Sequence, residues 1–508
     1  MGKYLLAHDL GTTGDKAVLF SEDGTLVRAV TAEYKTHYLG HGFVEQDPDD
    51  WWRAVCGSSA ELLKSVNPKD VAAVSFSGQM MGCLCVDRHG KPLRPSIIWA
   101  DTRSVREADA LGKAYGKTAF YRTSGHRISS SHTVTKLMWI KENEPEIYRQ
   151  AYKILCAKDY IVLKLTGRFV TDYSDASGTL AYNICGHMWA EDIMQAAGVD
   201  REKFPDILAA ATVVGEVGEK AARESGLPRG LPVVLGGGDG PCGLVGTGAI
   251  RDGTGYTYIG TSAWSKFCRT RPVRDPGMRV VTWNHVIPEF VAPTGTMQAA
   301  GASIAWMKEN LCAEERALAE KTGESVYKFI NENAAKSKRG AGGLLFLPHL
   351  QGERSPFWNV DAKGAFVGLT MRHGANDMKR AVFEGIAMNM GVIFHILQEN
   401  KIGLQDSMVL IGGGANSPVL RQAMADIYEM DMLIPDKLDE ATSMGAAIIA
   451  GRGVGLYQDF DVLDRFLSIK EVVHPVKENT EFFRELRKVF EECYFALEKV
   501  NEKLGRFE

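Results

Sequence analysis

A glycine- and threonine-rich turn follows an apolar strand at two places about half the chain apart. The first strand, residues 4–9, enters the turn Asp9-Leu10-Gly11-Thr12-Thr13-Gly14, and the second, residues 257–259, enters Gly260-Thr261-Ser262. A match over four residues arises easily by chance, but its position directly after a strand in both cases indicates a duplicated domain. A third strand, residues 408–411, enters another glycine turn, Gly412-Gly413-Gly414-Ala415-Asn416.

The segments around these turns predict an α/β protein. Apolar runs at residues 17–20 and 26–30 continue the first strand into an antiparallel meander. Asp47 and Pro48 are typical of a helix start, so we expect a helix that ends near Lys64. Residues 71–77 are almost all apolar, which predicts a central strand covered on both faces.

The length of the chain calls for more than one domain. A chain of 508 residues exceeds what one hydrophobic core normally supports. We expect a first domain over residues 1–247 and a second over residues 248–508. The segment Ala334 to Gly343 is predicted to be a surface loop, and residues 477–508 are predicted to form an amphipathic helix that packs back on the body.

Composition and charge narrow the class of protein. The chain has 45% hydrophobic and 24% charged residues, as ordinary globular proteins do, and its net charge is only -4. This small charge gives no reason to expect a nucleic acid or an anionic membrane as a partner. No cysteine pattern of a zinc site occurs among the nine cysteines, and no signal peptide or long apolar span is found. We therefore expect a cytoplasmic protein with reduced, buried thiols.

The glycine turns have the chemistry of a phosphate site. Glycine lets backbone N–H groups approach phosphate oxygens, and threonine and serine hydroxyls add neutral donors. Asp9 at a strand end can hold Mg²⁺, usually through water, and Lys16 adds a cation. The alternative for each turn alone is an ordinary hairpin. No P-loop motif occurs, and the glycine triplets at 236–238 and 412–414 lack the rest of a dinucleotide fingerprint, which disfavours a dehydrogenase.

Taken together, these motifs resemble those of a known family. The sequence is similar to the FGGY carbohydrate kinases of the actin–hexokinase superfamily, and most similar to the xylulokinases among them, over nearly the whole chain. The motifs that carry the resemblance are the three turns above, Glu45-Gln46-Asp47-Pro48 with Trp51-Trp52, Ser77-Gly78-Gln79-Met80, Trp99-Ala100-Asp101-Thr102-Arg103, Lys158-Asp159-Tyr160, Gly236-Gly237-Gly238-Asp239, Gly352-Glu353-Arg354-Ser355-Pro356, and two longer signatures at 131–143 and 364–384.

The resemblance implies two ribonuclease-H-like (actin-like ATPase) domains with ATP and a sugar in the cleft between them. It implies that Asp239 is the catalytic base and that Asp9 is associated with Mg²⁺. The residues that it places on ATP are Gly11, Thr12, Thr13 and Lys16 in the first loop, Gly260, Thr261 and Ser262 in the second loop, and Gly413, Gly414, Ala415 and Asn416 at the adenosine. From the residues alone, Asp239 could also cap a turn or the next helix.

The sugar site departs from the xylulokinase pattern. The resemblance places Gln79, Met80, Met81, Trp99, Asp101, Asp239 and Gly240 near the substrate. The family usually has His at the position of Met81 and Asn at the position of Gly240, so two polar sugar contacts are missing. His126 could replace one of them. Residues 352–359 resemble the gluconate kinase version of this segment, and Glu353-Arg354 could be a structural ion pair or a functional one.

The sequence thus predicts an ATP- and Mg²⁺-dependent kinase for a terminal hydroxyl of a small ketose, with D-xylulose, giving D-xylulose 5-phosphate, as the leading substrate. The first alternative is a kinase for another ketose, a polyol or an aldonate such as gluconate. The second is a non-catalytic regulator that binds sugar or nucleotide and keeps the kinase fold. The expected partner is a small sugar, and the resemblance allows a homodimer.

Overall fold

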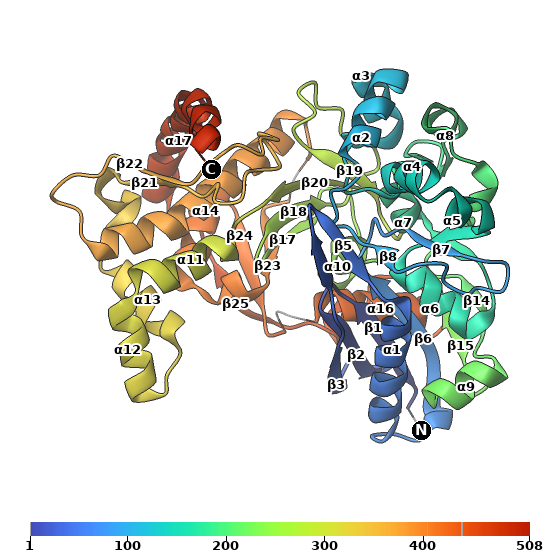
Figure 1. Ribbon diagram of the computed structural model, residues 1–508. Coiled ribbons are helices and arrows are strands. Elements are labelled where there is room, and N and C mark those ends of the chain that lie inside the picture. Colours follow the sequence, from blue (N-terminus) through green and yellow to red (C-terminus); the bar gives the residue numbers. More distant parts are fainter. Residues whose placement is uncertain (1, 404, 438–439, 508) are drawn as a thin grey trace.

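Two seven-stranded sheets form the framework of the protein, one in each half of the chain. The structure is a computed structural model that describes residues 2–403, 405–437 and 440–507. The first sheet has the order β14-β15-β6-β1-β2-β3, with β16 also paired to β6. Its strands are β1 (Tyr4–Leu10), β2 (Gly14–Ser21), β3 (Leu26–Glu33), β6 (Val71–Gly78), β14 (Val213–Glu216), β15 (Pro232–Val234) and β16 (Gly237–Gly238). Figure 1 shows the two sheets side by side with helices around them.

The second sheet has the order β19-β20-β18-β17-β23-β24-β25. Its strands are β17 (Gly255–Ile259), β18 (Ala263–Phe267), β19 (Val281–Asn284), β20 (Val291–Met297), β23 (Ser407–Ile411), β24 (Asp431–Pro435) and β25 (Ile469–Val473). In the first sheet β1 pairs with β2 antiparallel and with β6 parallel, and in the second β17 pairs with β18 antiparallel and with β23 parallel. This shared connectivity confirms the predicted α/β fold of two like halves.

Helices cover both faces of the first sheet because side chains of a strand alternate between faces. Helix α1 (Pro48–Leu63) begins as predicted, with the Asp47 side chain accepting the N–H of Asp49 at 2.9 Å. It packs over the face that carries Leu6, whereas Leu5 and Ala7 point to the opposite face.

That opposite face is covered from the far end of the chain. Helix α16 (Ala441–Gly453) packs against β1, β6 and α10 (Asp239–Gly246), and Figure 1 shows its orange-red ribbon beside the blue strands. Its residues Met444 and Ala446–Ala450 share one buried cluster with Leu5, Val18 and Phe20. The first sheet therefore completes its core with a helix from the second half of the sequence.

The second sheet packs against α14 (Ala375–Glu399) and α15 (Pro418–Tyr428). The terminal helix α17 (Lys477–Leu504) packs on these two helices, which confirms the predicted amphipathic helix. By length and composition α14 is the one helix among the described residues that could cross a membrane, but 89% of its most apolar stretch is buried in the protein.

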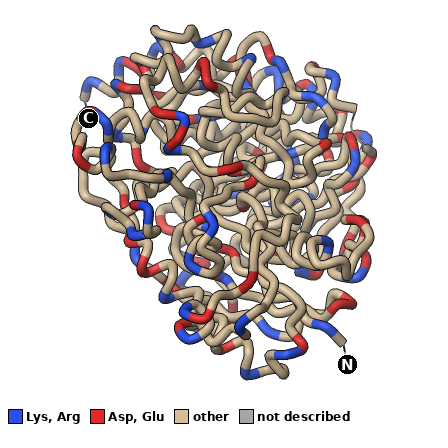
Figure 2. Tube along the Cα trace, turned by 90° about the vertical axis from the view of Figure 1, so that its right-hand side faces the viewer, with Lys and Arg blue, Asp and Glu red and all other residues tan. Residues whose placement is uncertain are grey.

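The prediction of a surface loop from Ala334 to Gly343 is wrong in part. Helix α13 (Val326–Ala335) extends into this segment, and Gly340 and Ala341 are buried. The backbone N–H of Gly340 donates to the Glu384 carboxylate at 2.9 Å, so an acidic side chain of α14 anchors the turn. Elsewhere on the surface, acidic and basic residues lie interspersed, as Figure 2 shows, in keeping with the small net charge.

Candidate active site

The turn after β1 is held from several sides. Its backbone carbonyl at Thr12 accepts a hydrogen bond from Gln46 Nε2 at 2.6 Å, and the Thr12 hydroxyl accepts one from the Trp99 indole at 2.9 Å. Gly11 N–H closes the turn on the Gly14 carbonyl at 2.9 Å, which leaves Thr13 exposed at its tip. The loop is thus a preformed hairpin end with an exposed threonine hydroxyl that can donate to a phosphate oxygen.

Asp9 and Asp239 meet at one edge of the first sheet. β1 and β16 both pair with β6, where Asp9 lies opposite Ser77 and Gly238 lies opposite Gly78. Asp239 follows directly and begins α10. Because parallel strands end at the same edge of a sheet, this topology brings the two carboxylates together.

Burial raises the pKa of both acids. Burial raises the pKa of Asp9, and its Oδ1 atom has no hydrogen-bond partner among the described residues, while Oδ2 accepts the Thr442 hydroxyl at 2.6 Å. Burial, with the Asp9 charge nearby, raises the pKa of Asp239 to about 6. The charge of Lys266 and the N–H of Gly240 act in the opposite direction and favour the ionised carboxylate.

The glycine run before Asp239 is required by close packing. Gly236 has a φ of 73°, and a Cβ there would lie 1.8 Å from the Phe76 carbonyl oxygen. A Cβ at Gly238 would lie 2.5 Å from the sulfur of Met80. Only glycine therefore lets β16 approach β6 closely enough to place Asp239 at the strand end.

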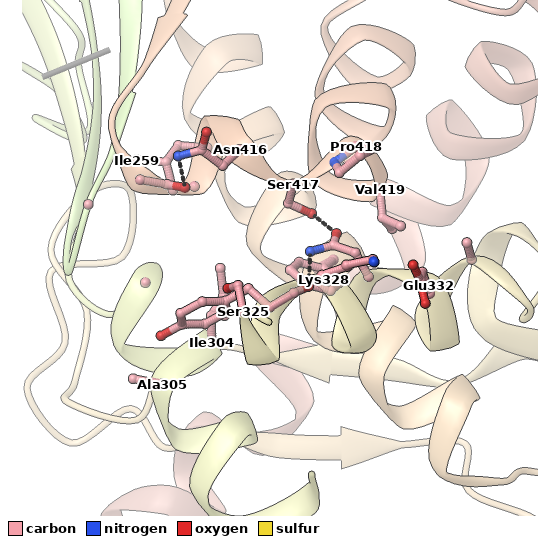
Figure 3. A pocket seen from close by; sticks show the side chains of 18 of the residues that line it. Ile259, Ile304, Ala305, Ser325, Lys328, Glu332, Asn416, Ser417, Pro418 and Val419 are labelled. Carbon is pink, nitrogen blue, oxygen red and sulfur yellow. Dashed lines mark hydrogen bonds between the residues drawn. The ribbon is translucent and has the colours of Figure 1, made fainter. Parts of the chain in front are cut away.

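The second Gly-Thr turn and the third glycine turn share a cavity of about 980 Å³. Gly260 and Thr261 lie at its wall together with Gly413, Gly414 and Asn416, and the remaining wall is largely apolar. Figure 3 shows Ile259 and Asn416 on one side and Ser325, Lys328 and Glu332 on the helix opposite. The volume suits a nucleotide-sized ligand with a base against apolar side chains and phosphates at the turn.

Five of the eleven residues predicted to bind ATP line this cavity, and the first-loop residues Gly11, Thr12, Thr13 and Lys16 do not. The side chain of Ala415 is fully buried, and neither Ala415 nor Ser262 lines the cavity. Lys16 forms an ion pair with Glu440 at 3.1 Å. With the Asp9–Thr442 hydrogen bond, this pair ties the first turn to the start of α16.

The predicted sugar residues lie at the end of β6. Gln79 donates to Gln46 at 2.7 Å and keeps a buried Oε1 without a partner among the described residues. Met80 is buried, and Met81 has a φ of 66°, in the left-handed region, with its carbonyl bound by Lys136 at 2.9 Å.

The carboxylate of Asp101 is bound by neighbouring groups of the protein. This carboxylate is fully buried, accepts the Val44 N–H at 2.6 Å, and pairs with Arg103 at 2.8 Å. Both oxygens of this carboxylate are therefore engaged by groups within the protein.

Sequence reasoning missed one side of this region. Lys266 of β18 and Trp283 of β19 lie against it, and His132 joins His126 beside the Trp283 ring. His126 Nε2, both ring nitrogens of His132 and Trp283 Nε1 are buried without hydrogen-bond partners among the described residues. Burial lowers the pKa of His126 to about 3, so its imidazole is neutral. The departures at Met81 and Gly240 were the sequence signals that other residues, such as His126, could serve here.

A nucleotide-sized cavity in the second half and two buried carboxylates at the edge of the first sheet are features expected of a phosphotransferase. The model of the FGGY family of carbohydrate kinases, N-terminal domain, matches residues 4–246, and the model of the C-terminal domain matches residues 255–454. The chain belongs to the FGGY family of carbohydrate kinases, whose members transfer a phosphoryl group from ATP to an alcohol group of a small sugar.

Named relatives are similar over nearly their whole length. The chain is 30% identical to a xylulose kinase of Staphylococcus xylosus, over 97% of this chain and 99% of the relative. It is also 30% identical to a gluconokinase of Bacillus subtilis, over 96% of this chain and 95% of that one. The crystal structure of a ligand-bound xylulose kinase from Lactobacillus acidophilus superposes with a TM-score of 0.92 at 26% identity, over 99% of this chain and 100% of that chain.

Proposed function

We propose that this kinase phosphorylates the terminal hydroxyl of a small open-chain sugar and that D-xylulose, giving D-xylulose 5-phosphate, is the leading acceptor. The observation that carries the proposal is the buried Asp239, whose pKa of about 6 suits a base near neutral pH. Similarity to proteins named xylulose kinase supports the choice of D-xylulose.

In this proposal Asp239 accepts the proton of the attacking hydroxyl as the sugar oxygen bonds to the γ-phosphorus and ADP leaves. Phosphoryl transfer asks the protein chiefly for positioning and charge neutralisation. The turns at Gly11–Thr13 and Gly260–Thr261 would hold the phosphates, and Gly413, Gly414 and Asn416 would hold the nucleoside. Gln79 and Met80 would contact the sugar.

The residues present fit a Mg²⁺ ion at Asp9. Its Oδ1 is buried without a partner among the described residues, and burial raises its pKa, so a divalent cation would supply the missing positive charge. Asp9 would hold the ion, through water, and the bound ion would neutralise charge on the triphosphate. The experiment for this assignment is direct binding of ATP with and without Mg²⁺ in Asp9→Asn and in the unaltered protein.

A second acceptor class is favoured by one observation. Lys266 places an ammonium group beside Asp239, in the space left by the missing side chain of Gly240. A cation at this place suits an acidic sugar, and a protein named gluconokinase is as similar in sequence as the xylulose kinase. An aldonate such as gluconate is therefore the second candidate.

The test is turnover with ATP and Mg²⁺ across a panel of ketoses, polyols and aldonates, with Asp239→Asn as the control. We expect product with at least one open-chain sugar and a 10²–10⁴-fold lower kcat in the variant, the usual contribution of a general base. A non-catalytic regulator would bind its ligands without product. Undiminished turnover by Asp239→Asn would remove the base assignment.

The organisation of the molecule is part of the proposal. A boundary between residues 1–247 and 248–508 is supported by the two sheets and by the family matches on either side of it. We place the kinase in the cytoplasm, where ATP is available. We propose a homodimer as its oligomeric state, which light scattering would test.

A further inference from the structure

Lys266 is a buried cation without a direct ion pair. The residue is only 6% exposed, and among the described residues its ammonium makes no ion pair or hydrogen bond, although the charge of Asp239 acts on it from farther away. The ammonium lies 5.3 Å from the centre of the Trp283 ring, a contact that offsets only part of the loss of water. Burying a charge without a direct partner is costly, and the more distant Asp239 offsets only part of that cost, so the ammonium can take an anionic ligand.

The position of the ammonium is made possible by Gly240. A Cβ built on Gly240 would lie 2.6 Å from Lys266 Nζ and 2.5 Å from Cε, closer than a side chain allows. The end of Lys266 thus fills the place that any side chain at residue 240 would take. Gly240 directly follows Asp239 and donates its N–H to that carboxylate at 2.6 Å, so the cation flanks the proposed base.

The neighbours of Lys266 belong to the acceptor side of the site. The Trp283 ring that it contacts lies 4.2 Å from the His126 ring, and His126 has a buried nitrogen without a partner among the described residues. The phosphate turn lies at the other end of β18, because Lys266 is three residue steps along the strand from Ala263, a rise of about 10 Å. Lys266 does not line the nucleotide cavity. Its charge is therefore presented to the acceptor and not to the adenosine side.

We propose that Lys266 is a specificity-determining residue that binds a carboxylate of the acceptor, so that the site gives an aldonate an interaction that a neutral ketose cannot make. The unpartnered nitrogens of His126, His132 and Trp283 then serve the acceptor's hydroxyls. This inference rests on the proposed function, since it names the class of sugar that the same site takes.

A purely electrostatic role for Lys266 is the main rival. The positive charge of Lys266 lowers the pKa of Asp239, so the lysine could act only by keeping the base ionised. That role would make every acceptor equally dependent on Lys266. If Lys266 binds a carboxylate, only the turnover of an anionic acceptor depends strongly on this lysine. The ratio of kcat/KM for an anionic acceptor to kcat/KM for a neutral one therefore distinguishes the two roles.

The experiment measures kcat and KM for D-gluconate and D-xylulose in the full-length protein, in Lys266→Met and in Lys266→Arg. We expect Lys266→Met to lower kcat/KM for D-gluconate by about 30-fold more than for D-xylulose, mainly through KM, as for loss of one partner of a buried charge pair. Lys266→Arg should recover most of the difference. Equal losses for both acceptors, or no effect on KM for D-gluconate, would overturn the inference.

A second variant and a control protect the result from folding effects. Gly240→Ala should displace the end of Lys266 without removing its charge. Like Lys266→Met, it should lower the ratio of kcat/KM for D-gluconate to kcat/KM for D-xylulose. Lys203→Met removes another buried lysine, which lies 4.5 Å from the Tyr148 ring, and should leave the ratio unchanged. If the unaltered protein phosphorylates D-xylulose but not D-gluconate, only this inference fails. If it phosphorylates no sugar, the proposed function fails as well.

Discussion

At the residue scale, neighbouring groups shift the pKa of Asp239 in opposite directions. Burial and Asp9 raise its pKa, whereas Lys266 and the Gly240 N–H lower it, with a resulting pKa of about 6. The Tyr256 hydroxyl, which donates to the Gly240 carbonyl at 3.1 Å, is a further titratable group beside this carboxylate. A carboxylate balanced in this way is ionised at neutral pH and still basic enough to accept a proton.

The first prediction concerns pH. Because the proposed base must be ionised, kcat/KM should fall about tenfold per pH unit below pH 6 and level off above it. In Lys266→Met the acid limb should move to higher pH, since the cation that lowers the pKa of Asp239 is gone. Rate profiles from pH 5 to 9 at constant ionic strength check both points. A limb that stays near pH 4 would contradict the raised pKa.

The second prediction concerns stability at the same residue. Folding raises the pKa of Asp239 from its ordinary value of 3.8 to about 6, so the folded state loses stability as pH rises between these two values, and the loss is complete above pH 6. Asp239→Asn should therefore raise the free energy of unfolding by about 3 kcal/mol at pH 8. At about pH 4 the gain should largely vanish. Thermal unfolding of both proteins at the two pH values measures the difference, and an equal shift at both would count against the mechanism.

At the element scale, one lysine holds three elements together. Lys158 of α6 (Ala157–Thr166) lies 2.6 Å from Asp159, 2.9 Å from Asp172 at the end of β10 (Val170–Asp172) and 3.1 Å from Asp175 of α7 (Tyr173–Gly178). All four side chains are buried. Burial raises the pKa of Asp159 and of Asp175, so this group holds fewer negative charges than its three carboxyls suggest.

The third prediction is that Lys158→Met lowers the free energy of unfolding by roughly 3–5 kcal/mol, because it leaves buried carboxyls without their cation. Asp175→Asn should cost less, since burial already favours its neutral form. Denaturant unfolding followed by circular dichroism measures both. Equal losses in the two variants would show that the lysine is not the centre of the group.

Strands, turns and helix starts could be predicted because local residues determine them. Asp47 with Pro48 marks the start of α1, and the apolar residues 71–77 mark β6. The segment at 334–343 could not be predicted, because its backbone is bound by Glu384, a residue distant in sequence. Lys266 also escaped prediction, since nothing near it in sequence shows that its side chain ends over Gly240.

At the scale of the whole molecule, the two lobes are not independent. Helix α16 covers the face of the first sheet that carries Leu5, Ala7, Val18 and Phe20. At its start, Thr442 binds Asp9 and Glu440 binds Lys16, so the helix that completes the first core also touches the first phosphate turn. The family likeness indicates two consecutive domains, whereas the packing of the first one needs a segment of the second.

The fourth prediction follows from this arrangement. A fragment of residues 1–247 should show no cooperative unfolding transition, because one face of its sheet is left exposed to water. A fragment in which residues 440–470 are joined to residue 247 by a flexible linker should regain one. Near-ultraviolet circular dichroism on heating distinguishes them. A sharp transition in the shorter fragment would show that α16 is dispensable for the first lobe.

Helix α16 also affects when the first lobe can fold during synthesis on the ribosome. The strands of the first lobe leave the exit tunnel early, but the helix that seals them is synthesised only after most of the second lobe. Domains usually fold in turn as they emerge, and this one must wait with an apolar sheet face uncovered. A message truncated ahead of α16 would thus yield two unfinished lobes instead of one, and the nascent chain is an expected client for chaperones that shield apolar surface.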